Sequence, residues 1–159
     1  HGPVGYGKIG SYEAFCSGGG IAQIARTYAL RDIQNGKPSA LCPDVAGLES
    51  LTAESTARAA REGNPTAKEV FELSGAEFGR ALSMLIDLFN PQRIVVGGIF
   101  SRCRDLIWPA AERVIAEEAL PDSRKACTVL PCELSESIGD MAALSVAVYY
   151  WEHGGEGKR

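Results

Sequence analysis

The spacing of apolar and polar positions predicts helices in the first part of the chain. Apolar residues recur three or four positions apart from Tyr12 onward, at Phe15, Ile21, Ile24, Ala25, Tyr28 and Ala29. Gly18-Gly19-Gly20 interrupts this pattern, so we predict a helix–turn–helix corner at the glycines. A loop is predicted from Asn35 to Gly47, where Asn, Gly and Pro are frequent.

Two further helices are predicted before the first strand. Thr52 has the character of an N-cap, and the short helix that it begins ends at Gly63. Asn64 and Pro65 then begin the longest helix, as cap and first helical residue, and Asn90-Pro91 ends it. Its wide apolar stripe consists of Val70, Phe71, Leu73, Phe78, Ala81, Leu82, Leu85, Leu88 and Phe89.

After Asn90 the pattern changes to strand, helix, strand and helix. The first two predicted elements are a buried parallel strand from Arg93 that stops at Gly97-Gly98 and a helix over Asp105–Leu120 with Pro109 near its first turn. The next two are a strand over Cys127–Leu134, where Pro131 marks a sheet edge or the end of the strand, and a helix over Met141–Trp151. This order is typical of α/β architecture. Two strands are too few for an independent sheet, so we expect a missing part of the protein or a second copy to complete it.

Composition and charge narrow the class of protein. The 159 residues are 45% hydrophobic and 23% charged, which suits one globular domain, and a net charge of -4 without basic runs excludes a nucleic-acid surface. We expect no membrane span and no signal peptide. The five scattered cysteines have no C-x-x-C pair, which favours reduced thiols in the cytoplasm. The chain begins with His-Gly-Pro, so we expect a fragment, a processed product or a tag remnant.

Three glycine-rich or acidic features could contribute to a ligand site. "VVGGIF" lacks the third glycine of a dinucleotide loop, and "SGGGIAQIA" lacks the Lys-Ser or Lys-Thr pair of a phosphate loop. Gly97 and Gly98 still allow a flat ligand or another backbone to approach closely, or they form only a tight turn. Glu13 begins a helix, where it either accepts hydrogen bonds from hydroxyl groups, as sugar sites require, or acts only as a capping acid.

Three segments resemble the ROK family (repressor, open reading frame, kinase). "HGPVGYGKIGSYEAFCSGGGIAQIA" is similar to the family's C-x-C-G-x-x-G-C-x-E segment, in which Gly7, Gly10 and Glu13 match. "NPQRIVVGGIFSRCRDLI" resembles its adenosine-site strand, and "ESIGDMAALSVAVYY" its C-terminal helix. The resemblance extends from about Gly2 to Tyr150, and the order of the segments is preserved.

The resemblance implies an α/β, actin-like ATPase (ribonuclease H-like) fold, of which residues 1–150 form the helix-rich C-terminal part with an incomplete sheet, followed by a disordered tail over residues 151–159. It implies an ATP-dependent kinase for a hexose or an N-acyl hexosamine. The alternatives are a sugar-sensing repressor and a non-enzymatic remnant or assembly module. Glu13 would bind the sugar, Gly97 and Gly98 would adjoin the adenine, and the complete protein would be a homodimer.

Departures from the family pattern limit what this chain does alone. The positions of three zinc-binding cysteines hold Val4, Tyr6 and Ser11, so we expect no zinc, and we expect Val4 and Tyr6 to hold the loop by packing. The family's phosphate-binding strand, catalytic aspartate and Glu-x-Gly-His motif lie upstream of this segment. We therefore assign no catalytic residue here, and we expect ATP and Mg²⁺ to act only in the complete protein.

Overall fold

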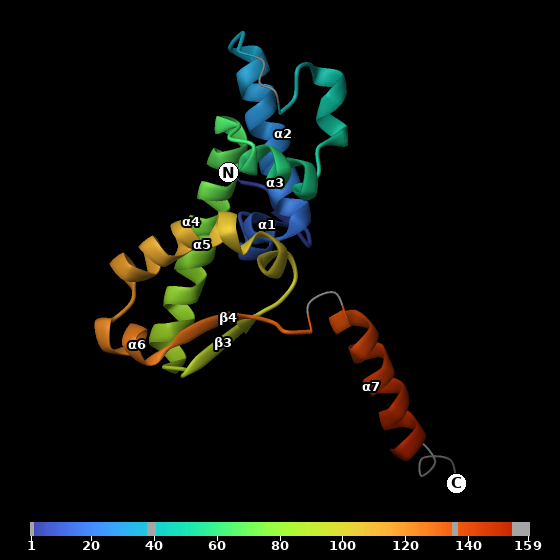
Figure 1. Cartoon of the computed structure of the whole chain (residues 1–159), viewed down its shortest axis with the longest axis vertical. Coiled ribbons are helices and arrows are strands. Elements are labelled where there is room, and N and C mark those ends of the chain that lie inside the picture. Colours follow the sequence, from blue (N-terminus) through green and yellow to red (C-terminus); the bar gives the residue numbers. More distant parts are fainter. Residues whose placement is uncertain (1, 38–40, 135–136, 154–159) are drawn as a thin grey trace.

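The computed structural model describes residues 2–37, 41–134 and 137–153. Most of the chain is helical, and the strands are short (Figure 1). In chain order the elements are β1 (Val4–Gly5), β2 (Lys8–Ile9), α1 (Tyr12–Cys16), α2 (Gly18–Gln34), the 3-10 helix η1 (Val45–Ser50), α3 (Ala53–Arg61), α4 (Pro65–Phe89), β3 (Arg93–Val96), α5 (Ile99–Glu118), α6 (Pro121–Ala126), β4 (Thr128–Pro131) and α7 (Ile138–His153).

The predicted corner near the start of the chain lies between α1 and α2. The break falls at Ser17 and not at the three glycines, which form the first turn of α2. Ser17 ends α1, and its hydroxyl oxygen accepts a hydrogen bond of 3.1 Å from the Gly20 amide as the N-cap of α2. Any Cβ at Gly20 would overlap the Ala14 carbonyl group, so glycine allows the two helices to meet at this corner.

The capping residues of α3 and α4 are those that the sequence predicted. Thr52 caps α3 and shares a reciprocal capping box with Ser55. Asn64 caps α4 with Pro65 at its first position, and Asn90 ends the helix in a left-handed conformation with φ 44. The loop predicted up to Gly47 is shorter than expected, because η1 already begins at Val45.

The predicted strand–helix–strand unit is present. β3 and β4 pair in parallel, with Arg93 opposite Thr128 and Val96 opposite Pro131, where the strand ends as predicted. The helix between them begins earlier than the predicted Asp105, because Gly98 acts as the N-cap of α5. The first turn of α5 meets the remainder at a kink at Cys103 (φ -124, ψ 25), and Pro109 lies in the middle of the helix.

The core of the molecule extends from α2, η1 and α3 along the contact between α4 and α5 to the inner face of the two strands. Val129 of β4 is buried there, whereas Val95 is exposed on the outer face of the sheet. Among the described residues, β3 and β4 pair only with each other. The sheet is therefore incomplete.

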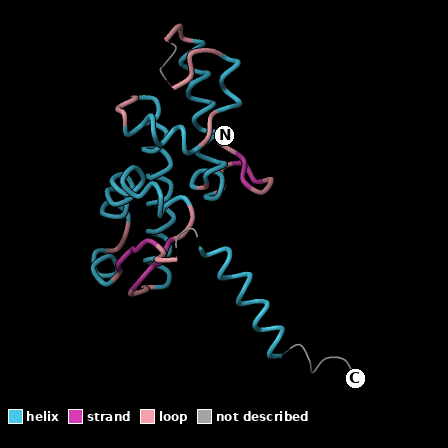
Figure 2. Tube along the Cα trace, turned by 45° about the vertical axis from the view of Figure 1, so that its right-hand side comes forward, coloured by secondary structure: helices cyan, strands magenta, loops and turns pink. Residues whose placement is uncertain are grey.

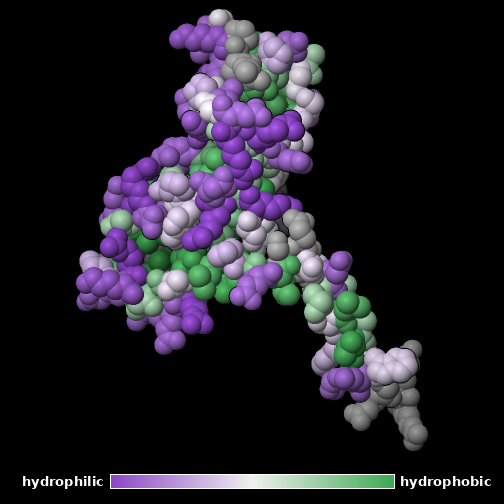
Figure 3. All heavy atoms as spheres, in the orientation of Figure 1, coloured by the Kyte–Doolittle hydropathy of each residue, from purple (hydrophilic) through white to green (hydrophobic). Residues whose placement is uncertain are grey.

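The last helix, α7, extends away from the other elements in both ribbon views (Figures 1 and 2). Its residues from 139 to 153 are all exposed, and Figure 3 shows hydrophobic residues together with hydrophilic ones on its visible face. Trp151, Glu152 and His153 are helical and do not belong to the tail predicted over residues 151–159. The rest of that predicted tail lies outside the described residues.

Candidate functional site

The site begins with the β1–β2 hairpin that precedes α1. Gly5 pairs with Lys8, so Tyr6 and Gly7 form a two-residue turn. Both have positive φ values, 48 and 72, as a type I′ hairpin turn requires. Ser11 follows the hairpin, and its hydroxyl oxygen accepts a hydrogen bond of 3.2 Å from the Ala14 amide, which caps α1. The hairpin thus leads directly into the helix that holds Glu13.

The expectation that Val4 and Tyr6 hold this loop by packing is wrong. Tyr6 is 92% exposed and Val4 is 45% exposed. Hydrogen bonds between the Val4 backbone and the Gln23 side chain hold Val4 instead. The Val4 amide donates to Oε1 of Gln23 at 3.0 Å, and Nε2 of Gln23 donates to the Val4 carbonyl oxygen at 2.9 Å.

The zinc ion that the family pattern implies does not fit these residues. Val4 has no donor atom in its side chain, Tyr6 points into solvent, and the Ser11 hydroxyl is engaged in capping α1. In the described ranges, no three His, Cys, Asp or Glu side chains gather as metal ligands. The absence of zinc remains a prediction.

Glu13 is exposed in the first turn of α1 and lines a cavity of about 280 Å³. The other walls of this cavity come from α1, α4, the end of β3 with the following Gly97, and α5. They are aromatic and aliphatic for the most part: Tyr12, Cys16, Ser74, Phe78, Ala81, Val96, Gly97, Ile99, Phe100 and Ile107. The arrangement combines one carboxylate with apolar walls, as in many sites for small polar molecules.

Two polar side chains lie deeper in this cavity, and both are neutral. Ser74 is 0% exposed, and within the described part of the chain its Oγ has no hydrogen-bond partner. Burial, with the carboxylates of Glu77 and Glu13 nearby, raises the pKa of the Cys16 thiol to about 12. At neutral pH the cavity therefore offers a carboxylate acceptor at Glu13 and a hydroxyl group at Ser74.

Gly97 lines the same cavity as Glu13. The sequence had assigned these two residues to different ligands, Gly97 to the adenine and Glu13 to the sugar. Gly98 is exposed at the start of α5, with φ 65 and ψ -135, a conformation that glycine adopts far more easily than other residues. The roles of Glu13, Gly97 and Gly98 in binding remain predictions. The structure does bring the first two together at one cavity.

A second cavity, of about 600 Å³, adjoins the first turns of α2 and α5. Gly18, Gly19, Ile99 and Arg102 are among its lining residues. Two arginines in its wall are held by internal contacts. Arg26 donates to the carbonyl oxygens of Leu48, Glu49 and Leu51, each at 3.2 Å.

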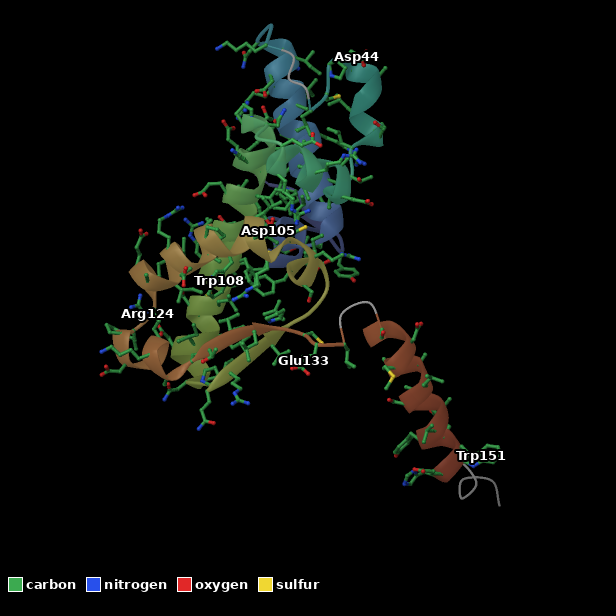
Figure 4. All side chains as sticks on the ribbon, in the orientation of Figure 1. Asp44, Asp105, Trp108, Arg124, Glu133 and Trp151 are labelled. Atoms are coloured by element: carbon green, nitrogen blue, oxygen red, sulfur yellow. The ribbon has the colours of Figure 1, made fainter. Side chains whose placement is uncertain are left out.

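Arg61, which also lines this cavity, forms a two-point ion pair with Asp105. Its Nε and Nη2 atoms donate to the two carboxylate oxygens of Asp105, each at 2.8 Å. This pair joins α3 to α5, and Asp105 lies on the part of α5 near α3 (Figure 4). The hydrogen bonds with Arg61 lower the pKa of the Asp105 carboxyl group. Sequence reasoning missed the residues that the structure adds to the site, because Gln23 and Arg26 of α2, Arg61 of α3 and Ser74 of α4 share no motif.

One family model, described as the ROK family, matches residues 2–149. The chain belongs to the ROK family. The match includes the hairpin, both cavities and most of α7, and it confirms the family that the three sequence segments predicted.

Relatives of this ROK chain include regulators and an enzyme. The DNA-binding transcriptional repressor Mlc of Escherichia coli K12 is 29% identical over 126 residues, which cover 79% of this chain and 28% of Mlc. A glucokinase of Halalkalibacterium halodurans is 30% identical over 119 residues, which cover 75% of this chain and 35% of the enzyme. The chain thus spans about a third of the length of these relatives.

Solved structures agree with the predicted fold. A ROK family glucokinase from Streptomyces griseus, in complex with glucose and AMPPNP, superposes with a TM-score of 0.68 at 25% identity. The match covers 88% of this ROK chain and 45% of that chain. The ROK chain therefore has the helix-rich part of an actin-like ATPase fold, with a sheet that the described residues do not complete. None of the described helices is long and apolar enough to cross a membrane.

Proposed function

We propose that this chain is the C-terminal part of an ATP-dependent ROK sugar kinase that phosphorylates a hexose or an N-acyl hexosamine in the cytoplasm. The observation that supports this best is the 280 Å³ cavity, where the Glu13 carboxylate lies with the buried, otherwise unpartnered Ser74 hydroxyl. A sugar presents both hydroxyl groups and apolar C–H faces. The polar groups of the cavity can bind the hydroxyl groups of a sugar, and its aromatic walls can pack against the apolar C–H faces.

Glu13 binds the sugar in this proposal by accepting hydrogen bonds from its hydroxyl groups. Ser74 contacts the sugar from within the cavity. Neither residue removes a proton from the reacting hydroxyl group, so both act in binding and not in the chemical step.

Gly97 and Gly98 adjoin the nucleotide, because residues without a Cβ leave room for a flat base at the start of α5. The glucokinase that was solved with AMPPNP supports ATP as the phosphoryl donor. ATP and Mg²⁺ act in the complete protein, in which the missing N-terminal half supplies the phosphate loop and the aspartate that accepts the hydroxyl proton. That half, or a second copy in a homodimer, would cover the exposed apolar residues of α7.

A second candidate function is that of a sugar-sensing repressor. Its support is the similarity to the repressor Mlc, at 29% identity over 79% of this chain. The cavity at Glu13 would then bind the inducing sugar without phosphorylation. A separate segment would contact DNA, since this chain has a net charge of -4.

Calorimetry on the complete protein tests the proposal, with glucose, N-acetylglucosamine and an ATP analogue as probes. Glu13→Ala removes a charged hydrogen bond, so it should weaken sugar affinity about ten- to a hundred-fold and leave nucleotide affinity unchanged. Gly98→Val should have the opposite effect. The exposed Glu49→Ala, which changes the charge equally outside this cavity, is the control. Intact sugar affinity in Glu13→Ala would show that Glu13 is only a capping acid.

A coupled assay of ATP consumption separates the two candidate functions. The complete protein should turn over ATP with glucose, N-acetylglucosamine or N-acetylmannosamine if it is a kinase. Sugar binding without turnover would favour the repressor. The 159-residue chain by itself should show no turnover, because it has neither phosphate loop nor catalytic aspartate.

A further inference from the structure

Among the described residues, the hydrogen bonds that join the β1–β2 hairpin to α2 come from one side chain, that of Gln23. Nε2 of Gln23 donates to the Val4 carbonyl oxygen at 2.9 Å, and the Val4 amide donates to Oε1 of Gln23 at 3.0 Å. The Gln23 amide thus satisfies both backbone polar groups of Val4, as a paired strand would. Gln23 itself lies on α2, nineteen residues further along the chain.

The hairpin has few other means of attachment. Tyr6 and Ile9 are 92% and 70% exposed, so their side chains contribute little packing. The hairpin base is closed internally, because the Gly10 amide donates to the Pro3 carbonyl oxygen at 2.9 Å. Two further contacts lie at α1: the Ser11 hydroxyl group donates to the Lys8 carbonyl oxygen at 3.4 Å, and a Cβ at Gly5 would lie 2.6 Å from the Ala14 amide nitrogen.

The position of the hairpin determines where α1 begins. The chain passes from β2 through Gly10 to Ser11, whose hydroxyl group caps α1, and Glu13 is the second residue of that helix. The Gly5 backbone rests against the same first turn. A shift of the hairpin therefore changes the support of the turn that holds the Glu13 carboxylate at the cavity.

We propose that Gln23 is a positioning residue, which locks the hairpin onto α2 without a metal ion and thereby fixes Glu13 at the 280 Å³ cavity. Its effect on sugar binding rests on the proposed function. The positions at which the family pattern implies zinc hold Val4, Tyr6 and Ser11, which offer no thiolate. Two directional hydrogen bonds from a neutral amide hold the same loop, so the attachment does not depend on metal.

Glutamine suits this position because its side chain both donates and accepts. A methionine of similar length cannot donate, and its sulfur is only a weak acceptor. A glutamate at neutral pH can accept from the Val4 amide but cannot donate to the Val4 carbonyl group. Both substitutions therefore remove the donated bond, and methionine also weakens the accepted one, which gives a graded test.

Hydrogen exchange on the 159-residue chain tests the attachment itself, with the Val4 and Gly10 amides as the readout. Gln23→Met should lower their protection about tenfold or more, and Gln23→Glu should give an intermediate value. A chelator such as EDTA should change nothing in the unaltered protein. Gln34→Met, at the exposed end of the same helix, is the control. Unchanged protection in Gln23→Met, or loss of protection in EDTA, would overturn the proposal.

Calorimetry on the complete protein, with glucose and N-acetylglucosamine as probes, tests the consequence for Glu13. Sugar affinity should fall about tenfold in Gln23→Met and less in Gln23→Glu, while ATP affinity stays constant. A released hairpin with unchanged sugar affinity would overturn the positioning role. If the unaltered complete protein bound neither sugar, the proposed function would fail. The exchange experiment alone would then decide whether Gln23 holds the hairpin.

Discussion

Gly79 of α4 lies directly against Ala111 of α5. A Cβ at Gly79 would be 2.7 Å from the Ala111 carbonyl oxygen, and one turn earlier a Cβ at Gly75 would be 2.5 Å from the Ile107 carbonyl oxygen. The two longest helices therefore touch backbone to backbone, which side chains at these positions would prevent. This contact supports the wall of the 280 Å³ cavity at Glu13, since Ile107 is one of the residues that line it.

Gly79→Ala should destabilise the chain by about 1–3 kcal/mol, because the added methyl group forces the helices apart. Gly19→Ala is a matched control in α2, where the nearest atom to the new Cβ would be Ser17 Oγ at 3.9 Å. There the change should be neutral or stabilising by less than about 1 kcal/mol. Urea unfolding followed by circular dichroism measures both. Equal effects of the two substitutions would contradict the close contact.

Arg26 should prove important for stability although it lies in a cavity wall. Its guanidinium group donates to three carbonyl oxygens at the end of η1, those of Leu48, Glu49 and Leu51. Arg26→Lys keeps the charge but cannot donate in this fork geometry, so a loss of about 1–3 kcal/mol is expected. Arg58→Lys, on the exposed surface of α3, should have little effect. Urea midpoints that are the same for both variants would disprove the role of Arg26.

The hairpin turn should become more stable when asparagine replaces Tyr6. Tyr6 has a positive φ of 48, which is unfavourable for a bulky residue by roughly 1–2 kcal/mol. Tyr6→Asn creates the Asn-Gly pair that type I′ turns prefer, so the Gly10 amide should exchange about three- to tenfold more slowly. Gly7→Ala should have the opposite effect, since φ there is 72. Faster exchange in Tyr6→Asn would show that the Tyr6 side chain stabilises the hairpin.

The stability of the chain should depend on Cys16 at high pH. Burial, followed by the carboxylates of Glu77 and Glu13, raises the pKa of the Cys16 thiol from 9.0 to about 12. Between these values the unfolded chain loses this proton while the folded chain keeps it, so the contribution of Cys16 to stability falls as the pH rises. It is complete below the unfolded pKa of 9.0 and is lost as the pH rises through about 12.

Cys16→Ala isolates this contribution. The free energy of unfolding of the original chain should fall relative to the variant by up to about 1.4 kcal/mol per pH unit above pH 9. Urea unfolding of both proteins at about pH 8 and about pH 10.5 measures the difference. Parallel pH curves for the two proteins would mean that the thiol titrates equally in the folded and unfolded states.

Local signals in the sequence predicted the helices that have strong caps and the strand–helix–strand unit of β3 and β4, but not the β1–β2 hairpin. Thr52, Asn64 and Pro65 lie at the helix starts that they predicted, because a cap depends only on the adjacent backbone amides. The apolar run from Arg93 forms the predicted parallel strand, as its β-branched residues favour, but it is not buried as predicted, because none of its four residues is buried. The family resemblance also came from the sequence alone, through three segments in preserved order.

Only the tertiary structure decided which residues meet at the site. Gln23 and Val4 are nineteen residues apart, and Ser74 approaches the cavity of Glu13 from a different helix. No local pattern encodes such contacts, because they arise when separate helices pack against one another. The first turn of α5 was also missed: Gly98 begins this helix directly after β3 without a side-chain cap, and the helix packs against α4.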